Sequence, residues 1–286
     1  MRAALCALGL LAALIGPPAV AEPQDVEVSS LDRRGDAPLK LRGFWFAREG
    51  ETKPAPALVL LHGCGGPYDR RGRLSQRMQD YAALLNREGW HVLVIDSLGA
   101  RGETELCTQR TGERAVTMTQ RRRDALGALQ WLAARPDVDG ARLGLIGWSN
   151  GGSTVLAALQ RGHREVDAAA VRPAFGVAFY PGCIDPQRRG WQPVAPLLML
   201  LGGADDWTPS APCEALAARV GAAVQHETYP GAYHGFDGDA PVRLRRDVPN
   251  GVNPGQGVHV GGDPAAREAS RERLLRFLRE RVAASR

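Results

Sequence analysis

The chain has 286 residues, of which 44% are hydrophobic and 23% are charged. These fractions lie near the globular average and exclude a disordered or collagen-like chain. The formal net charge is +5, but the basic runs Arg121–Arg123 and Arg243–Arg246 are short and contain no aromatic residues. Because nucleic-acid binding requires clustered basic charge, we expect these arginines to form a solvated surface, with no nucleic-acid partner.

The N-terminus has the features of a cleavable export signal. Arg2 gives a short positive region, Ala3–Ile15 is apolar but too short to span a bilayer, and Ala19–Ala21 fits the small-x-small cleavage pattern. We therefore predict a signal peptide over residues 1–21 and a mature chain that begins at Glu22. The predicted location is secreted and periplasmic, without a stable membrane anchor.

Strands and helices alternate along the mature chain, which predicts an α/β protein with a mostly parallel central sheet and helices on both faces. We expect residues 22–286 to form a single domain. Only residues 235–263, which are rich in Gly, Pro, Asn and Asp, break the alternation and predict a long irregular loop. The predicted strands are Leu39–Ala47, Ala57–Leu61, His91–Ile95, Leu143–Gly147, Phe175–Tyr180, Leu197–Leu201 and Val224–Tyr229, and the predicted helices are Leu74–Arg87, Val116–Ala134, Gly151–Gln160, Cys213–Val220 and Ala265–Val282.

Four cysteines remain once Cys6, inside the predicted signal, is set aside. An even number in an oxidising compartment predicts two disulfides, for which three pairings exist. We favour Cys64–Cys107 and Cys183–Cys213, because each pair would join loops at the same end of a parallel sheet. The alternative is four buried free thiols. Neither CxxC nor HxxxH spacing is present, so no metal site is expected.

A glycine-rich turn between a predicted strand and a predicted helix carries the candidate nucleophile. The segment Gly147-Trp148-Ser149-Asn150-Gly151 fits the pattern G-x-S-x-G. Small flanking residues let the backbone turn sharply there and expose the serine hydroxyl above the sheet. The N-terminus of the following helix favours developing negative charge. The sequence predicts Ser149 as a nucleophile; the alternative is an idle serine in a strand-to-helix turn.

The candidate acid and base follow later strands. Asp205 comes after the strand that ends near Leu201, and His234 comes after the last predicted strand. The order Ser, Asp, His along the chain is that of α/β-hydrolases. We choose Asp205 over its neighbour Asp206, which is then a helix N-terminal or loop residue. His62 precedes the serine and is predicted to be structural.

The segment His62-Gly63-Cys64-Gly65-Gly66 directly follows a predicted buried strand. Serine hydrolases of this type take one oxyanion donor from such a loop and the other from the residue after the nucleophile. We therefore predict that the backbone N–H groups of Cys64 and Asn150 form an oxyanion hole. The alternative for the first loop is an ordinary turn. Trp148, beside the serine, is a further candidate for contact with substrate.

Together these segments resemble the dienelactone hydrolase family, and in particular its exported bacterial branch. The resemblance covers most of the mature chain, from about Ala57 to the C-terminal helix. It implies an α/β-hydrolase fold, a small-molecule ester or lactone substrate, an acyl-enzyme intermediate and no cofactor. The matching segments are His62 to Gly66, Asp96 to Gly102, Gly147 to Gly152, Gly203 to Pro209 and Gly231 to Phe236.

Two positions bear on the substrate that the resemblance implies. Ser149 stands where the founding members of the family have cysteine. Arg101 resembles the family arginine that meets the substrate carboxylate; the alternative is a loop arginine that pairs with a nearby acid. Two other functions stay open: a peptidase or acyl-peptide hydrolase on the same fold, and an inactive hydrolase fold that binds a ligand. The sequence does not indicate the oligomeric state.

Overall fold

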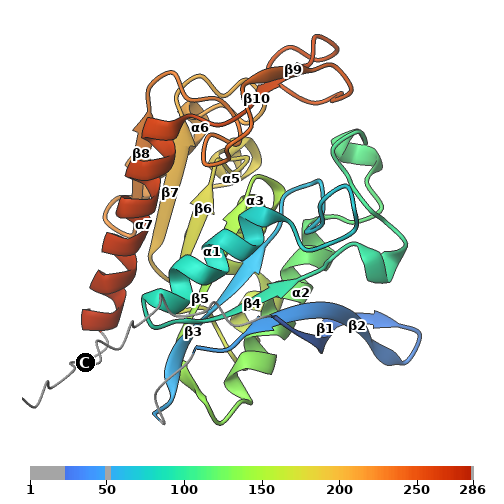
Figure 1. The fold of residues 1–286 in the computed structure, drawn as a ribbon, viewed down its shortest axis with the longest axis vertical. Helices are drawn as coiled ribbons and strands as arrows, with labels where there is room; N and C mark the ends of the chain where they lie inside the picture. The colour runs from blue at the N-terminus through green and yellow to red at the C-terminus, as the bar shows by residue number, and fades with distance from the viewer. Residues whose placement is uncertain (1–22, 49–52, 285–286) are drawn as a thin grey trace, which may run out of the picture.

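A computed structural model describes residues 23–48 and 53–284, so the predicted signal peptide lies outside the described residues. The described residues form an eight-stranded sheet in the order β1-β2-β4-β3-β5-β6-β7-β8 (Figure 1). β1 pairs antiparallel with β2, and β2 antiparallel with β4, whereas the remaining neighbours are parallel. The strands are β1 (Gln24–Arg34), β2 (Ala37–Phe46), β3 (Ala55–Leu61), β4 (His91–Ile95), β5 (Val138–Trp148), β6 (Phe175–Phe179), β7 (Leu197–Gly202) and β8 (Val224–Tyr229).

Helices cover both faces of this sheet, as the alternation of elements predicts. α1 and α7 pack on one face, and α2, α3 and α6 pack on the other. None of the helices within the described part of the chain is long and apolar enough to cross a membrane. The helices are α1 (Gln76–Arg87), α2 (Met118–Ala133), α3 (Asn150–Leu159), α4 (Arg164–Asp167), α5 (Ile184–Arg188), α6 (Ala211–Val220) and α7 (Pro264–Ala284), with the short 3-10 helices η1 (Gly99–Arg101) and η2 (Thr111–Glu113).

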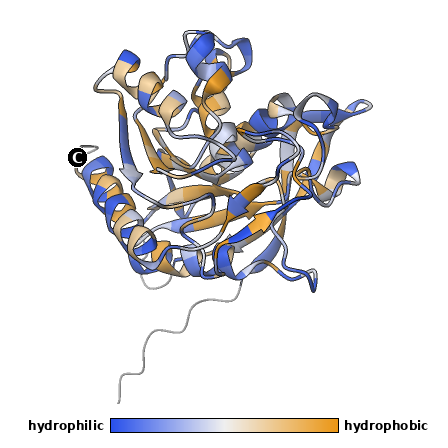
Figure 2. Cartoon of the chain, turned by 90° about the horizontal axis from the view of Figure 1, so that it is seen from above, coloured by the Kyte–Doolittle hydropathy of each residue, from blue (hydrophilic) through white to orange (hydrophobic). Residues whose placement is uncertain are grey.

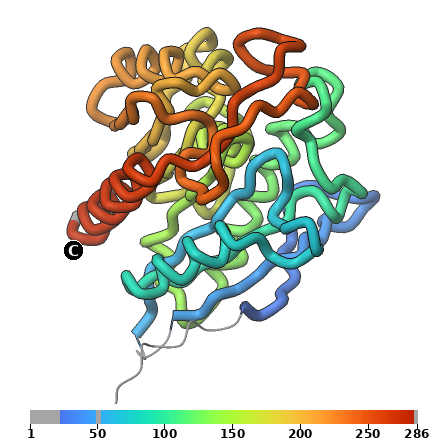
Figure 3. Tube along the Cα trace, turned by 45° about the horizontal axis from the view of Figure 1, so that its top comes forward, coloured from blue at the N-terminus to red at the C-terminus, as the bar shows by residue number. Residues whose placement is uncertain are grey.

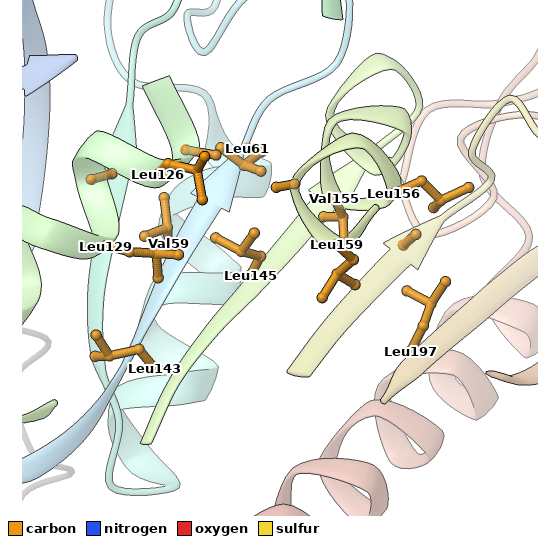
Figure 4. Close-up of a cluster of buried hydrophobic side chains, with 14 of the residues drawn as sticks. Val59, Leu61, Leu126, Leu129, Leu143, Leu145, Val155, Leu156, Leu159 and Leu197 are labelled. Atoms are coloured by element: carbon orange, nitrogen blue, oxygen red, sulfur yellow. The ribbon is translucent and has the colours of Figure 1, made fainter. Parts of the chain in front are cut away.

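The central strands are apolar on both faces because both faces are covered. In β3, Val59 and Leu61 point towards α2 and α3, and Leu58 and Leu60 point towards α1 and α7. Figure 4 shows the first of these two layers, and Figure 2 shows the same segregation, with apolar strands inside polar outer helix faces. Burial of each such leucine contributes roughly 1.5–3 kcal/mol.

The predicted fold class is confirmed, and the bounds of β4 and β8 agree with the predicted ones. The short helices α4, α5, η1 and η2 and the strands β1, β9 and β10 were not predicted. β1 is a mostly exposed edge strand, and its only sequence signal is the alternation that buries Val28 and Ser30. The segment 235–263, predicted to be irregular, contains a small antiparallel ladder of β9 (Arg243–Arg245) and β10 (Val258–Val260).

Both favoured disulfides are present. Cys64–Cys107 links the turn after β3 to the segment that follows η1, and Cys183–Cys213 links the start of α5 to α6. All four half-cystines are buried. The first disulfide joins two loops at the carboxyl ends of strands, and the second joins the loop after β6 to the first turn of α6.

We predict that replacing both Cys183 and Cys213 by serine lowers the free energy of unfolding by about 3–4 kcal/mol, because the bond closes a loop of 30 residues in the unfolded chain. Urea unfolding followed by circular dichroism measures this difference. The oxidised wild-type protein, with both disulfides formed, is the reference. An unchanged transition midpoint in the variant contradicts the prediction.

Candidate active site

The turn at Ser149 is closed so tightly that its flanking residues have to be glycines. Ser149 has φ 54° and ψ −116°, a backbone conformation that L-residues rarely adopt. A Cβ on Gly147 would lie 2.1 Å from the Gly151 carbonyl oxygen, and a Cβ on Gly151 would lie 1.9 Å from that of Leu61. The glycines let α3 begin against the end of β3. This packing holds the serine in its strained conformation.

Three side chains from three loops form a continuous line of hydrogen bonds. Ser149 Oγ lies 2.9 Å from His234 Nε2, and His234 Nδ1 lies 2.8 Å from Asp205 Oδ2. His234 and Asp205 are buried, whereas Ser149 is partly exposed. The structure thus brings the predicted nucleophile, base and acid together, and of these three only the serine is open to solvent.

The two neighbouring aspartates have different partners. Besides His234, Asp205 accepts hydrogen bonds from the backbone N–H groups of Trp207 and Thr208, both at 2.8 Å. Asp206 instead accepts a hydrogen bond from the backbone N–H of His259 at 2.8 Å, and its carboxylate lies 2.7 Å from His259 Nδ1. Asp205 therefore orients the imidazole of His234, and Asp206 fastens the segment that follows His234.

That segment is anchored at two places, and Figure 3 shows it passing beside the chain around residues 105–113. Asn250 donates to the Gln109 carbonyl oxygen at 2.9 Å and accepts from the Thr111 backbone N–H at 3.2 Å. The Gly261 N–H donates to the carbonyl oxygen of His234 at 3.0 Å. The long loop is thus fixed to His234 near its C-terminal end, through Gly261, and to the segment around the Cys64–Cys107 disulfide at its middle, through Asn250.

Two aromatic rings flank His234, and a buried carboxylate holds one of them. The rings of Tyr180 and Trp207 each lie 4.6 Å from the imidazole, centroid to centroid. Asp237 accepts from the Tyr180 hydroxyl at 2.6 Å and from Trp148 Nε1 at 2.9 Å. Burial raises the pKa of the Tyr180 hydroxyl well above its usual range, so this group donates to the carboxylate.

Trp148 is consequently not placed to contact substrate. Its side chain is 1% exposed and stacks on Phe179 on the side of the sheet that α1 covers. Side chains alternate across a strand, so Trp148 shares the face of Ile146. The prediction that Trp148 contacts substrate is therefore wrong, and its buried indole instead donates a hydrogen bond to Asp237.

Arg101 is also engaged elsewhere. Its guanidinium donates to both carboxylate oxygens of Asp124 at 2.9 Å and to Asp32 at 2.8 Å, and its side chain is 11% exposed. A further hydrogen bond goes to the Ser97 carbonyl oxygen at 2.7 Å. We therefore assign Arg101 to the alternative considered above, an arginine that pairs with nearby acids and joins η1 to β1 and α2.

The loop after β3 holds the Cys64 N–H in a defined direction. The Ser97 N–H donates to His62 Nε2 at 3.2 Å, so the other ring nitrogen carries the proton and donates to the Gly63 carbonyl oxygen at 2.7 Å. The C=O of Gly63 and the N–H of Cys64 share one planar trans peptide and point in opposite directions. His62 thus has a structural role, and its hydrogen bond to Gly63 makes the Cys64 N–H point away from the His62 ring.

Neither predicted oxyanion donor has an internal partner. Within residues 23–48 and 53–284, nothing accepts a hydrogen bond from the backbone N–H of Cys64 or of Asn150. Asn150 is the first residue of α3, where no preceding helical turn supplies an acceptor. Both N–H groups are therefore free to bind an oxygen atom beside Ser149. In the described part of the chain, no cluster of three His, Cys, Asp or Glu side chains is arranged to hold a metal ion.

We predict that His62 stays neutral in the folded protein as the pH falls from 7 to 5. Burial, followed by the charge of Arg121, holds the pKa of His62 well below its ordinary value. Below about pH 6.5 the unfolded chain binds a proton at His62 that the folded chain does not. The free energy of unfolding therefore falls by about 1.4 kcal/mol for each pH unit as the pH decreases. Urea unfolding at pH 7, 6 and 5 measures the slope, and His62→Gln is expected to make it shallower by that amount. An equal slope in the variant contradicts the prediction.

Comparison with known proteins places the chain in a family. Residues 41–282 match the family described as the dienelactone hydrolase family. The uncharacterised protein Rv2307c of Mycobacterium tuberculosis is 26% identical over 217 residues, which are 67% of each chain.

Two solved structures share the fold. A dienelactone hydrolase-like promiscuous phosphotriesterase from metagenomic libraries has a TM-score of 0.61 at 19% identity, covering 91% of this chain and 99% of its own. Esterase 2 of Thermogutta terrifontis, phosphorylated by paraoxon, has a TM-score of 0.62 at 15% identity, covering 93% and 97%. The match over residues 41–282 shows that the chain belongs to the dienelactone hydrolase family.

Proposed function

We propose that this protein is a serine hydrolase that cleaves carboxylic esters or lactones through an acyl-enzyme, with Ser149, His234 and Asp205 as its catalytic triad. The observation that carries the proposal is the line of hydrogen bonds from Ser149 Oγ through His234 to Asp205, at 2.9 and 2.8 Å. Membership of a hydrolase family and the fold shared with an esterase support it.

The geometry supports a two-step acyl transfer. His234 Nε2 takes the proton of Ser149 as the hydroxyl oxygen attacks the ester carbonyl carbon. The carbonyl oxygen becomes an oxyanion, which the N–H groups of Asn150 and Cys64 stabilise. His234 then returns the proton to the leaving alcohol. Water, deprotonated by the same imidazole, cleaves the acyl-enzyme and releases the acid and the free serine.

Asp205 acts through His234 and not on the substrate. Its carboxylate fixes the imidazole with the proton on Nδ1 and stabilises the imidazolium that forms in each step. The N–H groups of Trp207 and Thr208 hold the carboxylate in place, so it does not rotate away when the imidazole becomes charged. No step in this sequence involves a metal or an organic cofactor.

We further propose that the enzyme acts outside the cytoplasm, in the periplasm, after removal of residues 1–21. Two disulfides support this location, since disulfides persist in oxidising compartments. The substrate class in this proposal is a small ester or lactone.

Ser149→Ala removes the attacking oxygen and leaves the turn intact. We expect kcat for p-nitrophenyl acetate to fall at least about 10⁴-fold, because loss of the nucleophile disables the whole triad. Initial-rate kinetics on the purified mature protein measure this, with circular dichroism as the control for folding. A variant that hydrolyses the ester at the wild-type rate contradicts the assignment.

Exchanging each neighbouring aspartate for asparagine separately tests the choice between them. We expect Asp205→Asn to lower kcat about 10³–10⁴-fold, because an amide favours the wrong tautomer of His234. Asp206→Asn, the matched control, leaves that hydrogen bond in place and is expected to keep kcat within about threefold of wild type. Equal losses in the two variants, measured with the same ester, would exclude Asp205 as the orienting acid.

Peptidase activity on the same fold is the competing proposal. A panel of short esters, lactones, aryl esters and aminoacyl p-nitroanilides separates the two, because a triad alone cleaves either bond and the surrounding pocket decides between them. Hydrolysis of the esters without the anilides supports the proposed class. The reverse pattern supports the peptidase.

A further inference from the structure

Arg121 is a buried cation next to the candidate site. The sequence suggested a solvated run of three arginines, and for Arg121 that expectation is wrong, because its side chain is fully buried in α2. Its neighbour Arg122 is nearly as buried but pairs with Glu165 at 2.7 Å. Arg121 has no carboxylate at ion-pair distance among the described residues.

The partners of Arg121 belong to the two segments that carry the predicted oxyanion donors. Nη1 donates to Asn150 Oδ1 at 2.5 Å, and Nη2 donates to the His62 carbonyl oxygen at 2.8 Å. Asn150 supplies one free N–H, and the other belongs to Cys64, two residues after His62. One planar guanidinium thus spans the gap between the first residue of α3 and the loop after β3.

We infer that Arg121 is a positioning residue for the oxyanion hole, which fixes the distance and direction between the N–H groups of Asn150 and Cys64. This inference rests on the proposed function. Arginine suits the task, because its donors form a rigid planar fork and a lysine ammonium has no such geometry. The guanidinium fixes the position of the His62 carbonyl group. The His62 ring fixes the Gly63 carbonyl group, and the Cys64 N–H points in the opposite direction.

The electrostatics show what this arrangement costs. Burial lowers the pKa of Arg121 to about 10, and Nε has no hydrogen-bond acceptor among the described residues. An arginine kept only for stability would be expected to have a carboxylate partner, as Arg122 has. The charges of Asp124 and Asp96 partly offset the burial of Arg121, but neither carboxylate is hydrogen-bonded to it among the described residues, and both Nη groups bind the donor-bearing segments instead.

The test compares kcat, KM and transition-state binding in three variants. Arg121→Met keeps an unbranched stem and removes the fork, Arg121→Lys keeps the charge alone, and Arg122→Met is the control at a similarly buried arginine outside the site. The readouts are p-nitrophenyl acetate kinetics and inhibition by phenylboronic acid, whose tetrahedral adduct on serine places an oxygen in the oxyanion hole.

We expect Arg121→Met to lower kcat about 10- to 100-fold with KM within threefold, and to weaken phenylboronic acid by a similar factor. Arg122→Met is expected to change neither by more than threefold. Arg121→Lys is expected to lose at least about fivefold in kcat, which keeps the test decisive if the methionine variant does not fold.

Three outcomes overturn the inference. One is a folded Arg121→Met or Arg121→Lys variant with wild-type kcat, and another is a loss of kcat without any loss of boronate affinity. The third is an equal loss in Arg122→Met, which would indicate a general effect of removing a buried arginine. Wild-type protein that hydrolyses no ester and binds no boronate contradicts the proposed function itself, and the role of Arg121 with it.

Discussion

Backbone contact between the turn after β5 and the end of β3 is the constraint on which the site depends. The approach is so close that a single methyl group at Gly151 would lie 1.9 Å from the carbonyl oxygen of Leu61. Because the two segments touch, the first residue of α3 and the loop after β3 both lie beside Ser149. The positive φ of Ser149 is the conformational cost of that contact, and the packing of α3 against the sheet sustains it.

Beneath the site, the interior contains several buried polar groups. Arg121, His62 and Asp237 are buried and hydrogen-bonded to backbone or side chains that carry or support the candidate catalytic groups. Apolar residues of similar size would be less costly to bury, since a buried polar group loses its hydration. The buried polar side chains therefore lower stability, but they fix the directions of hydrogen-bond donors and acceptors, as electrostatic preorganisation requires.

Much of the fold follows from sequence patterns that are local. Buried parallel strands such as β3 and β4 are continuous apolar runs, and the glycine spacing around Ser149 reflects contacts within a few residues and one neighbouring strand. Alternation along β5 also predicts that the side chain of Trp148 is buried, because Trp148 shares a face with Ile146. Helical spacing likewise predicts that Arg121 is buried, because it lies on the same side of α2 as the buried residues Ala125 and Ala128.

Other features depend on tertiary contacts that no local pattern encodes. Asp205 and Asp206 are adjacent and chemically identical, and only the positions of His234 and His259 in space separate their roles. The acids that hold Arg101 come from β1 and α2, far away in the sequence. The anchoring of residues 235–263 through Asn250 likewise joins segments about 140 residues apart.

The most direct test of the account is covalent labelling of the folded mature protein with an organophosphonate fluoride, followed by intact mass and peptide mapping. If Ser149 is an activated nucleophile beside an oxyanion hole, the protein gains one phosphonyl group, on the peptide that contains Ser149, and urea-unfolded protein gains none. A folded protein that takes up no adduct, or that carries it on another residue, would contradict the central claim.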